Sequence, residues 1–267
     1  LLLQRVEERG DALAIIDLEN DYVPDTERKL SEETTYLGSV SSAITSLTDR
    51  ALNTSYGCAY YPWVKINDNI NNQMVWVPPS VVALGVMSYN DKVRAPWFAP
   101  AGFNRGGLSG GAGGIPVIDV RQKLNSDDRD DLYSNNINPI ASFPNEGVVV
   151  FGQKTLQLQA SALDRINVRR MLLFCKRGIT RIARGVLFDP NIQVTWTRFI
   201  SEANPFLDNV KSDFGLVDFR LVLDETTTTP DMQDRNIIFA RIFLKPTKAA
   251  EFIAIEFNIT SQGATFT

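Results

Sequence analysis

Among its 267 residues the chain has no histidine. A Ser-His-Asp or Cys-His mechanism would therefore have no base, and a zinc site would lose its commonest protein ligand. A hydrolase that works with carboxylates alone, or a magnesium site, stays open on composition. The absence of histidine argues against most familiar classes of enzyme.

Cysteines, long apolar runs and excess charge are also scarce. The two cysteines, Cys58 and Cys175, are far apart and flanked by apolar residues, which predicts buried thiols in a reducing compartment rather than a disulfide framework. No apolar run approaches the roughly 18 residues needed to cross a bilayer. The net charge of −4 gives no overall electrostatic reason to bind nucleic acid or an anionic membrane. With 44% apolar residues, the chain is long enough to bury a sizeable core.

The first half of the chain alternates helical and strand patterns. Such an order predicts βαβ units and a parallel sheet. A proline pair at residues 78–79 is typical of a helix start, where the first amide donors have no partner anyway. The expected elements are a helix over residues 1–9 closed by Gly10, a strand over 12–18, a helix over 36–51, strands over 56–66 and 74–77, and a helix from residue 79.

The second half groups its helices in the middle, which indicates an α+β arrangement. The expected elements are strands over 148–151, 216–223, 237–244 and 252–259, and helices over 163–187 and 192–210. We place the boundary near residues 136–141. The predicted fold class is thus α/β plus α+β, with a first domain over residues 1–138 and a second over 139–267.

A glycine-rich segment over residues 95–116 is typical of a loop. A P-loop needs Lys-Ser or Lys-Thr after its glycines, and a Rossmann turn needs a helix there. The glycines at 110–114 lead instead into Ile115 and Pro116. No nucleotide or other cofactor is predicted.

Adjacent acidic residues occur at 7–8, 127–128, 130–131 and 224–225. Neighbours in sequence point in different directions, so solvated loops and helix ends explain them better than a catalytic or metal site. Asp17 and Asp224 lie at strand ends, but no partner for either is evident from sequence. No catalytic or metal-binding residue is predicted.

One stretch stands out for its positive charge. Between Leu163 and Gly185 the chain has seven cations against one acid, a net charge of +6, so the remainder carries −10. At helical spacing, one face collects Arg170, Arg177, Arg181 and Arg184, provided that Gly178 does not break the helix. The ordinary interpretation is a solvated helix whose arginine stems cover apolar surface. The functional interpretation is a docking surface for an acidic protein or for nucleic acid.

Several strings in series resemble the contractile-tail sheath proteins of myovirus-type bacteriophages. Residues 95–106 read APWFAPAGFNRG, similar to the family's W-x-A-P-A-G-x-x-R-G signature, and residues 243–253 read FLKPTKAAEFI, similar to its K-P-x-x-x-x-E-F-I ending. The matching strings between them are WVPPS at 76–80, INPI at 137–140, GVVVFG at 147–152 and INVRR at 166–170. The match runs in order from about Tyr56 to the C-terminus, and residues 1–55 fit less distinctly.

The resemblance implies a structural protein rather than an enzyme. Sheath subunits stack as hexameric rings around a tail tube, and the cylinder contracts to drive the tube through the host envelope. The family combines a core domain of subtilisin-like topology with a smaller C-terminal α+β domain near the tube. Terminal arms add strands to neighbouring subunits. The chain would then be the C-terminal half of a longer subunit, without its N-terminal arm, and by itself monomeric or weakly associated.

The implied partners are other sheath subunits, the tail tube protein, and the baseplate and tail terminator proteins, without direct nucleic-acid binding or membrane insertion. The implied location is the phage tail of the virion, assembled in the host bacterial cytoplasm. The basic residues named above become a tube-facing or intersubunit surface, and Ile255, Phe257 and Ile259 a strand-augmentation edge. Two alternatives stay open, the sheath of a phage-derived injection device such as a bacteriocin or secretion particle, and a carboxylate- or metal-dependent hydrolase.

Overall fold

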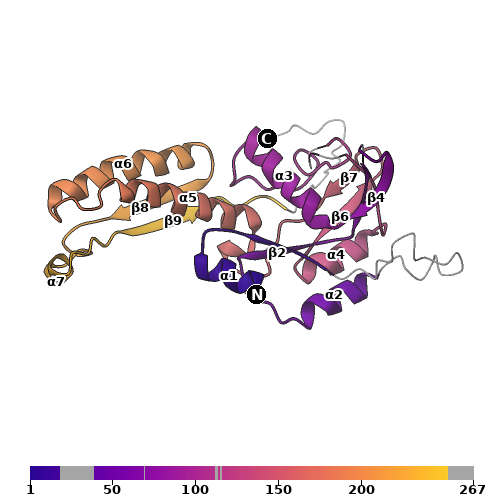
Figure 1. The fold of residues 1–267 in the computed structure, drawn as a ribbon, viewed down its shortest axis with the longest axis horizontal. Helices are drawn as coiled ribbons and strands as arrows, with labels where there is room; N and C mark the ends of the chain where they lie inside the picture. Colours follow the sequence, from indigo (N-terminus) through magenta and orange to yellow (C-terminus); the bar gives the residue numbers. More distant parts are fainter. Residues whose placement is uncertain (19–38, 69, 112–113, 115, 252–267) are drawn as a thin grey trace, which may run out of the picture.

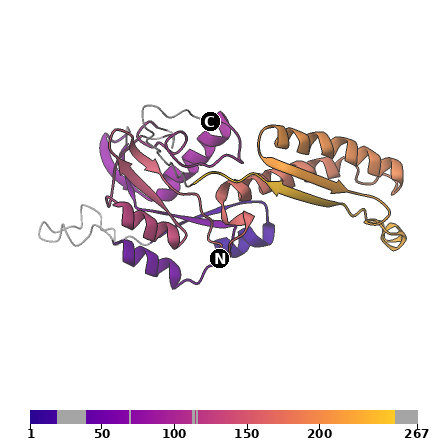
Figure 2. The same ribbon diagram turned by 180° about the vertical axis from the view of Figure 1, so that it is seen from behind.

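A computed structural model describes residues 1–18, 39–68, 70–111, 114 and 116–251. These residues form two lobes that lie end to end along the long axis of the molecule (Figures 1 and 2). The N-terminal lobe is a mixed sheet covered by helices, and the second lobe is a helix pair laid along a two-stranded sheet.

A four-stranded sheet organises the first lobe, in the order β1 (Ala14–Asp17), β2 (Gly57–Tyr61), β6 (Ile137–Phe143) and β7 (Gly147–Val150). The first three strands are parallel neighbours, and β7 returns antiparallel to β6. The predicted parallel sheet is therefore confirmed for β1, β2 and β6, with one antiparallel strand added at the edge.

Helices cover both faces of this sheet: α3 lies on one face, α2 and α4 lie on the other, and α1 packs beside β1 (Figure 1). Pro79 opens α3, as the proline pair predicts. Gly10 closes α1 in the left-handed conformation, with φ 64°. The bounds are α1 Leu2–Arg9, α2 Val40–Thr48, α3 Pro79–Val93 and α4 Ser126–Ser134.

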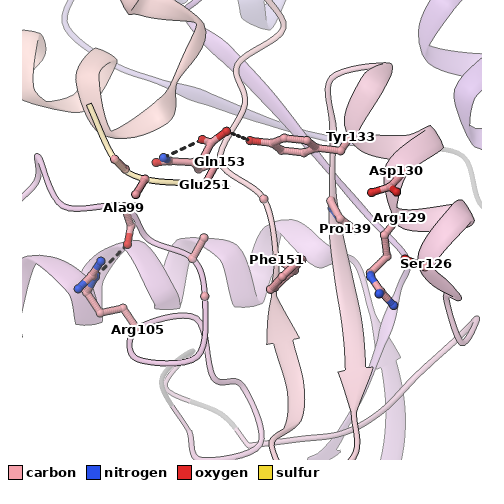
Figure 3. A pocket seen from close by; sticks show the side chains of 15 residues that line it. Ala99, Arg105, Ser126, Arg129, Asp130, Tyr133, Pro139, Phe151, Gln153 and Glu251 are labelled. Carbon is pink, nitrogen blue, oxygen red and sulfur yellow. Dashed lines mark hydrogen bonds between the residues drawn. The ribbon is translucent and has the colours of Figure 1, made fainter. Parts of the chain in front are cut away.

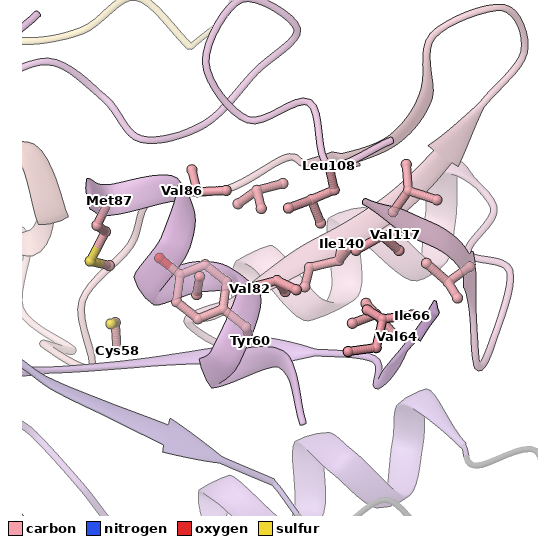
Figure 4. Close-up of a cluster of buried hydrophobic side chains, with 14 of the residues drawn as sticks. Cys58, Tyr60, Val64, Ile66, Val82, Val86, Met87, Leu108, Val117 and Ile140 are labelled. Carbon is pink, nitrogen blue, oxygen red and sulfur yellow. The ribbon is translucent and has the colours of Figure 1, made fainter. Parts of the chain in front are cut away.

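The central strand β2 is buried along its whole length, and its side chains alternate between the two helical layers. Cys58 and Tyr60 pack in the cluster that contains Val82 of α3 (Figure 4). Ala59 and Tyr61 pack in the cluster on the opposite face, with α2 and α4. The four-stranded sheet thus has a helical layer packed on each of its faces.

A second sheet corrects the strand predicted over residues 56–66. This strand is divided, because β2 ends at Tyr61 and β3 (Val64–Asp68) belongs to an antiparallel sheet with β4 (Gln73–Val77) and β5 (Val117–Val120). The division falls at Pro62, which has no N–H to continue a ladder.

The acidic stretch before β6 forms the start of a helix. The Asn125 side chain accepts from the Asp128 amide at 2.7 Å, and the Asp128 carboxylate accepts from the Asn125 amide at 3.1 Å. Asp127 and Asp128 thus lie in the first turn of α4, where negative charge complements the helix dipole. A helix terminus accounts for these neighbouring acids, as predicted.

The second lobe packs α5 (Ile166–Arg184) and α6 (Gln193–Ser212) against β8 (Leu216–Val222) and β9 (Arg241–Pro246), with the short α7 (Pro230–Asp234) at its tip. The strand predicted over 237–244 starts later, at Arg241. Ahead of it, the Phe239 amide donates to the Thr228 hydroxyl at 3.0 Å rather than to a strand partner. The strand predicted over 252–259 lies outside the described residues.

The long helix α5 belongs to both lobes. It runs unbroken through Gly178, where an added side chain would strike the Phe206 ring of α6. At its start Ile166 is fully buried in the core of the first lobe, whereas Met171 and Cys175 lie in the core of the second. Judged by side-chain packing, the boundary between the two lobes therefore lies within the first turns of α5.

The domain boundary drawn after residue 138 falls inside β6. Ala59 pairs with Ile137 on one side of that point, and Ile140 pairs with Val150 on the other, so one sheet includes both sides. Residues 139–150 are thus part of the first lobe. A short apolar strand reads the same in sequence whichever sheet it joins, so the sequence alone does not assign these residues to one lobe or the other.

Both cysteines are free and buried, as predicted. Burial raises the pKa of the Cys58 thiol to about 12 and that of Cys175 to about 11, so neither is a reactive thiolate near neutral pH. Among the described residues, no helix is long and apolar enough to span a membrane, and no three metal-ligating side chains cluster.

Candidate assembly surfaces

Trp97, in the glycine-rich segment of the first lobe, contacts the second lobe. Its indole N–H donates to the carbonyl of Asp213 at 2.7 Å, and its ring meets Phe174 edge to face, with ring centroids 5.3 Å apart. Its own carbonyl accepts from the Asn167 side chain at 3.1 Å. A side chain at Gly215 would strike the indole, so this close approach requires glycine. Trp97 therefore fixes one lobe against the other.

Cations in the first half of α5 are bound within the chain. Arg170 pairs with Asp91 of α3 at 2.6 Å, and Lys176 donates to the Gly10 carbonyl at 2.9 Å. Arg169 is itself buried. Of the four arginines predicted on an assembly surface, Arg170 is thus an internal contact between the lobes.

Arg177, Arg181 and Arg184, in the second half of α5, are exposed. They share one helical face with Arg170, because the helix continues through Gly178. No ion pair joins any of the three to another described residue. We call Arg177, Arg181 and Arg184 together the Arg177 face. Its exposed positive charge is complementary to an acidic surface.

Glu251 holds the chain to the first lobe after β9. Its carboxylate accepts from Arg165 at 2.7 and 2.9 Å, from the Tyr133 hydroxyl at 2.9 Å and from the Gln153 amide at 3.1 Å. The pair is largely buried, with side-chain exposures of 27% for Arg165 and 17% for Glu251. Burial, together with the negative charge of Glu251, raises the pKa of the Tyr133 phenol. We call these four residues the Glu251 clasp.

A cavity of about 430 Å³ lies beside the clasp, between the glycine-rich segment, α4 and the end of β7 (Figure 3). Arg105 and Arg129 line it from two sides, and Phe151 lies between them. Its walls come from segments far apart in sequence, so the fold rather than any one motif creates it.

The two-stranded sheet of the second lobe has open edges. β8 and β9 pair only with each other in the described part of the chain, and α5 and α6 pack against this sheet. Unpaired strand edges are templates for strand addition. The edge predicted from Ile255, Phe257 and Ile259 lies outside the described residues.

The two aspartates at strand ends have structural partners that the sequence did not show. Asp17 accepts from the Ser80 amide at 3.0 Å and from the Ser80 hydroxyl at 2.6 Å, which caps the start of α3. Asp224 accepts from Thr226 in the turn after β8, and these hydrogen bonds lower its pKa. Both residues support the fold.

Comparisons with known proteins relate the chain to phage tail sheath proteins. Residues 159–260 match the phage tail sheath C-terminal domain. The tail sheath protein of Vibrio phage KVP40 is 40% identical over 199 residues, which are 74% of this chain and 29% of that protein. The tail sheath protein of Enterobacteria phage T4 is 33% identical with the same coverage. The chain therefore contains a region like the sheath C-terminal domain and is similar to phage tail sheath proteins over about three quarters of its length, while it spans less than a third of the length of those relatives.

Solved structures with the sheath fold extend the likeness to nearly the whole chain. The contracted sheath complex of the extracellular contractile injection system PVC is 23% identical, with a TM-score of 0.72 over 96% of this chain and 68% of that one. The contracted helical sheath of the anti-feeding prophage is 22% identical, with a TM-score of 0.72 over 96% of this chain and 64% of that one. These likenesses confirm the sheath fold, including residues before Tyr56 that the motifs matched less distinctly.

The structure gives two residues of the sheath motifs a role that sequence reasoning missed. Trp97 of the signature joins the lobes, and Glu251 of the ending forms the clasp. A tryptophan in a proline- and glycine-rich segment without periodicity was the available signal for Trp97. Nothing local signals Glu251, because its partners lie 86 to 118 residues away.

Proposed function

We propose that the chain is the C-terminal part of a structural subunit of a phage contractile tail sheath. The subunit polymerises as stacked hexameric rings around the tail tube, and the sheath contracts to drive the tube through the host envelope. The observation that carries the proposal is the 40% identity with the KVP40 tail sheath protein over 199 residues.

The partners under this proposal are other sheath subunits, the tail tube protein, and the baseplate and tail terminator proteins. The location is the tail of the virion, after assembly in the host cytoplasm. A solved structure of the anti-feeding prophage baseplate, 24% identical with a TM-score of 0.69, contains a chain of the same fold.

A sheath in a phage-derived injection device is the second candidate. Three of the solved structures come from such devices, but at 22–24% identity they speak for the fold alone. The phage relatives KVP40 and T4 are 40% and 33% identical, which favours a phage tail. The contacts of the described carboxylates do not support a hydrolase.

The open edges of β8 and β9 are the proposed acceptors for arms of neighbouring subunits. Strand addition links subunits through backbone hydrogen bonds, so the link survives a change of lattice. Both strands are six or seven residues long, which is enough for a continuous ladder.

The Arg177 face is the proposed contact with the tube or with a neighbouring subunit. Exposed ion pairs are individually worth about 0–1 kcal/mol, so a surface of this kind can release and re-form during sliding. We expect the double change Arg177→Glu and Arg181→Glu in the full-length subunit to impair sheath assembly on the tube. Arg5→Glu on α1, an exposed arginine outside α5, is the control for a change of surface charge. Sheaths of unchanged number and length in the double variant would discard this assignment.

Contraction under this proposal needs no nucleotide, because it is a downhill change between two lattices of the same subunit. The shared helix α5, the Trp97 contact and the Glu251 clasp all join the two lobes. They favour a subunit that moves mainly as a rigid body, with its arms as hinges.

Negative-stain electron microscopy of the full-length subunit beside this 267-residue chain tests the proposal. Long hollow cylinders from the full-length protein alone would support a sheath in which the missing part supplies the linkage. Cylinders from both would support the sheath and contradict that role of the missing part. Discrete particles from both at every concentration and salt would overturn the proposal.

A further inference from the structure

An exposed aromatic cluster borders the cavity beside the Glu251 clasp. Phe103 comes from the glycine-rich segment, Phe143 ends β6 and Phe151 follows β7, and the ring centroids are 5.0–5.8 Å apart. Phe103 is 49% and Phe151 41% exposed, so these rings are not part of the core. Arg129 stacks over Phe143 at 5.1 Å, and Arg105 lines the same cavity. Phenylalanine clusters with arginine at the edge are typical of protein interfaces.

Arg105 has no ion-pair partner among the residues that the structure describes. Its Nε donates to the Ala99 carbonyl at 3.0 Å, and its Cζ lies 5.5 Å from the Phe98 ring. No described carboxylate pairs with it. Its pKa is lowered by partial burial and then by the nearby charge of Arg94. A carboxylate in the cavity would accept two hydrogen bonds from this guanidinium and relieve the repulsion.

A second polar group of the cavity is also incomplete. Gln153 is 3% exposed, and its Nε2 donates to Glu251. Its Oε1 has no hydrogen-bond partner among the described residues, although a buried amide oxygen ordinarily has one. The cavity therefore offers donors to a carboxylate and an acceptor to an N–H group, beside an apolar wall. A peptide segment with an acidic and an apolar side chain would supply the carboxylate, a backbone N–H group and the apolar contact.

We propose that this surface, the Phe151 socket, receives an acidic, partly apolar segment of a second copy of the chain. The socket consists of Phe103, Arg105, Arg129, Phe143, Phe151 and Gln153. Charge complementarity selects the occupant, because outside residues 163–185 the chain carries a net charge of −10. The inference rests on the proposed polymer, which brings copies of the chain into contact.

The first test measures the lowest subunit concentration at which the full-length protein polymerises. Arg105→Glu should raise this concentration at least tenfold, and Arg105→Lys should raise it less, because lysine keeps the charge but loses the two-pronged geometry. Arg5→Glu serves as the control for a change of surface charge. An unchanged thermal midpoint in Arg105→Glu shows that the variant folds. Polymerisation of Arg105→Glu at the unchanged concentration would overturn the socket.

The second test identifies the occupant. The photoreactive residue benzoylphenylalanine replaces Phe151 in the full-length subunit, and mass spectrometry maps the cross-links. Cross-links between copies, at a segment that contains Asp or Glu, support the proposal. Cross-links only within one copy, to residues 252–267, or only to a different protein overturn it. Failure of the unchanged subunit to form cylinders would instead contradict the proposed function, so the two failures are distinguishable.

Discussion

At the scale of single residues, Asn138 shows how one buried polar side chain joins distant segments. It is fully buried in β6, and its amide donates to the carbonyls of Ala59 and Lys154 at 3.0 and 2.8 Å. Its Oδ1 accepts from the Lys154 amide at 2.6 Å. Every hydrogen-bonding atom of the side chain thus serves the backbone, which explains an asparagine inside an otherwise apolar strand.

The buried thiol of Cys58 makes the free energy of unfolding decrease at alkaline pH. Burial raises the pKa of its thiol from 9.0 to about 12, so above about pH 9 the unfolded chain releases a proton that the folded chain keeps. The free energy of unfolding should therefore lose up to about 1.4 kcal/mol per pH unit between about pH 9 and 12, and nothing from this group below that range. Urea unfolding at several pH values measures the slope.

Cys58→Ala separates this thiol from the other groups that titrate at alkaline pH, Cys175 and Tyr60 among them. The variant should show a shallower decline than the unchanged chain. Equal slopes for the two proteins would contradict the assignment.

At the scale of the elements, Gly178 determines how closely α5 and α6 pack. An added Cβ would strike the ring of Phe206, which itself stacks on Phe174 at 5.8 Å. Although alanine favours a helix over glycine, Gly178→Ala should destabilise the chain by about 1–3 kcal/mol, since the ring has to move. Chemical unfolding measures the loss. Phe206→Leu in the same chain should recover part of it, whereas a stabilising Gly178→Ala would show that the ring is not confined.

Sequence periodicity predicted the elements whose pattern is local. The stripe of α5 and the proline start of α3 are examples, because the signal lies within the element itself. The split at Pro62 has a local signal, a proline without an N–H, that the prediction of one strand over residues 56–66 overlooked. The start of β9 was missed because it depends on the side chain that the backbone meets elsewhere.

The candidate surfaces were predicted less completely for the same reason. Sequence spacing placed Arg170 on one face with Arg177, and the face exists, but the salt bridge of Arg170 with Asp91 spans 79 residues. The Phe151 socket has no sequence signature, because the fold brings Phe103 of the glycine-rich segment to the two rings of the β6–β7 hairpin.

At the scale of the whole molecule, we expect both lobes to unfold together. The Trp97 contact and the common helix α5 couple them, so the buried Trp196 of the second lobe and the secondary structure of the whole chain should report one transition. Trp97→Ala should destabilise the second lobe by about 2–4 kcal/mol and separate the two signals. Fluorescence and circular dichroism, recorded in one urea titration, make the comparison.

Two further variants show which contact of Trp97 couples the two lobes. Trp97→Phe keeps an aromatic ring against Phe174 but loses the hydrogen bond to Asp213, and should cost about 1 kcal/mol. Phe188→Ala at the fully exposed tip should change stability by less than about 0.5 kcal/mol. Coincident transitions in Trp97→Ala would show that the lobes are coupled by other contacts.

The position of α5 also bears on how such genes recombine. The region that matches the sheath C-terminal domain starts at residue 159, ahead of a helix whose first turn, with Ile166, completes the core of the preceding lobe. A genetic crossover near residue 159 would replace Ile166 and Asp213 with the residues of another sheath protein, while Trp97 and the rest of the first lobe would stay the same. Such an exchange would preserve the fold only where the incoming segment fits both the core of the first lobe and the indole of Trp97, because the start of the matched region and the packing boundary between the lobes do not coincide.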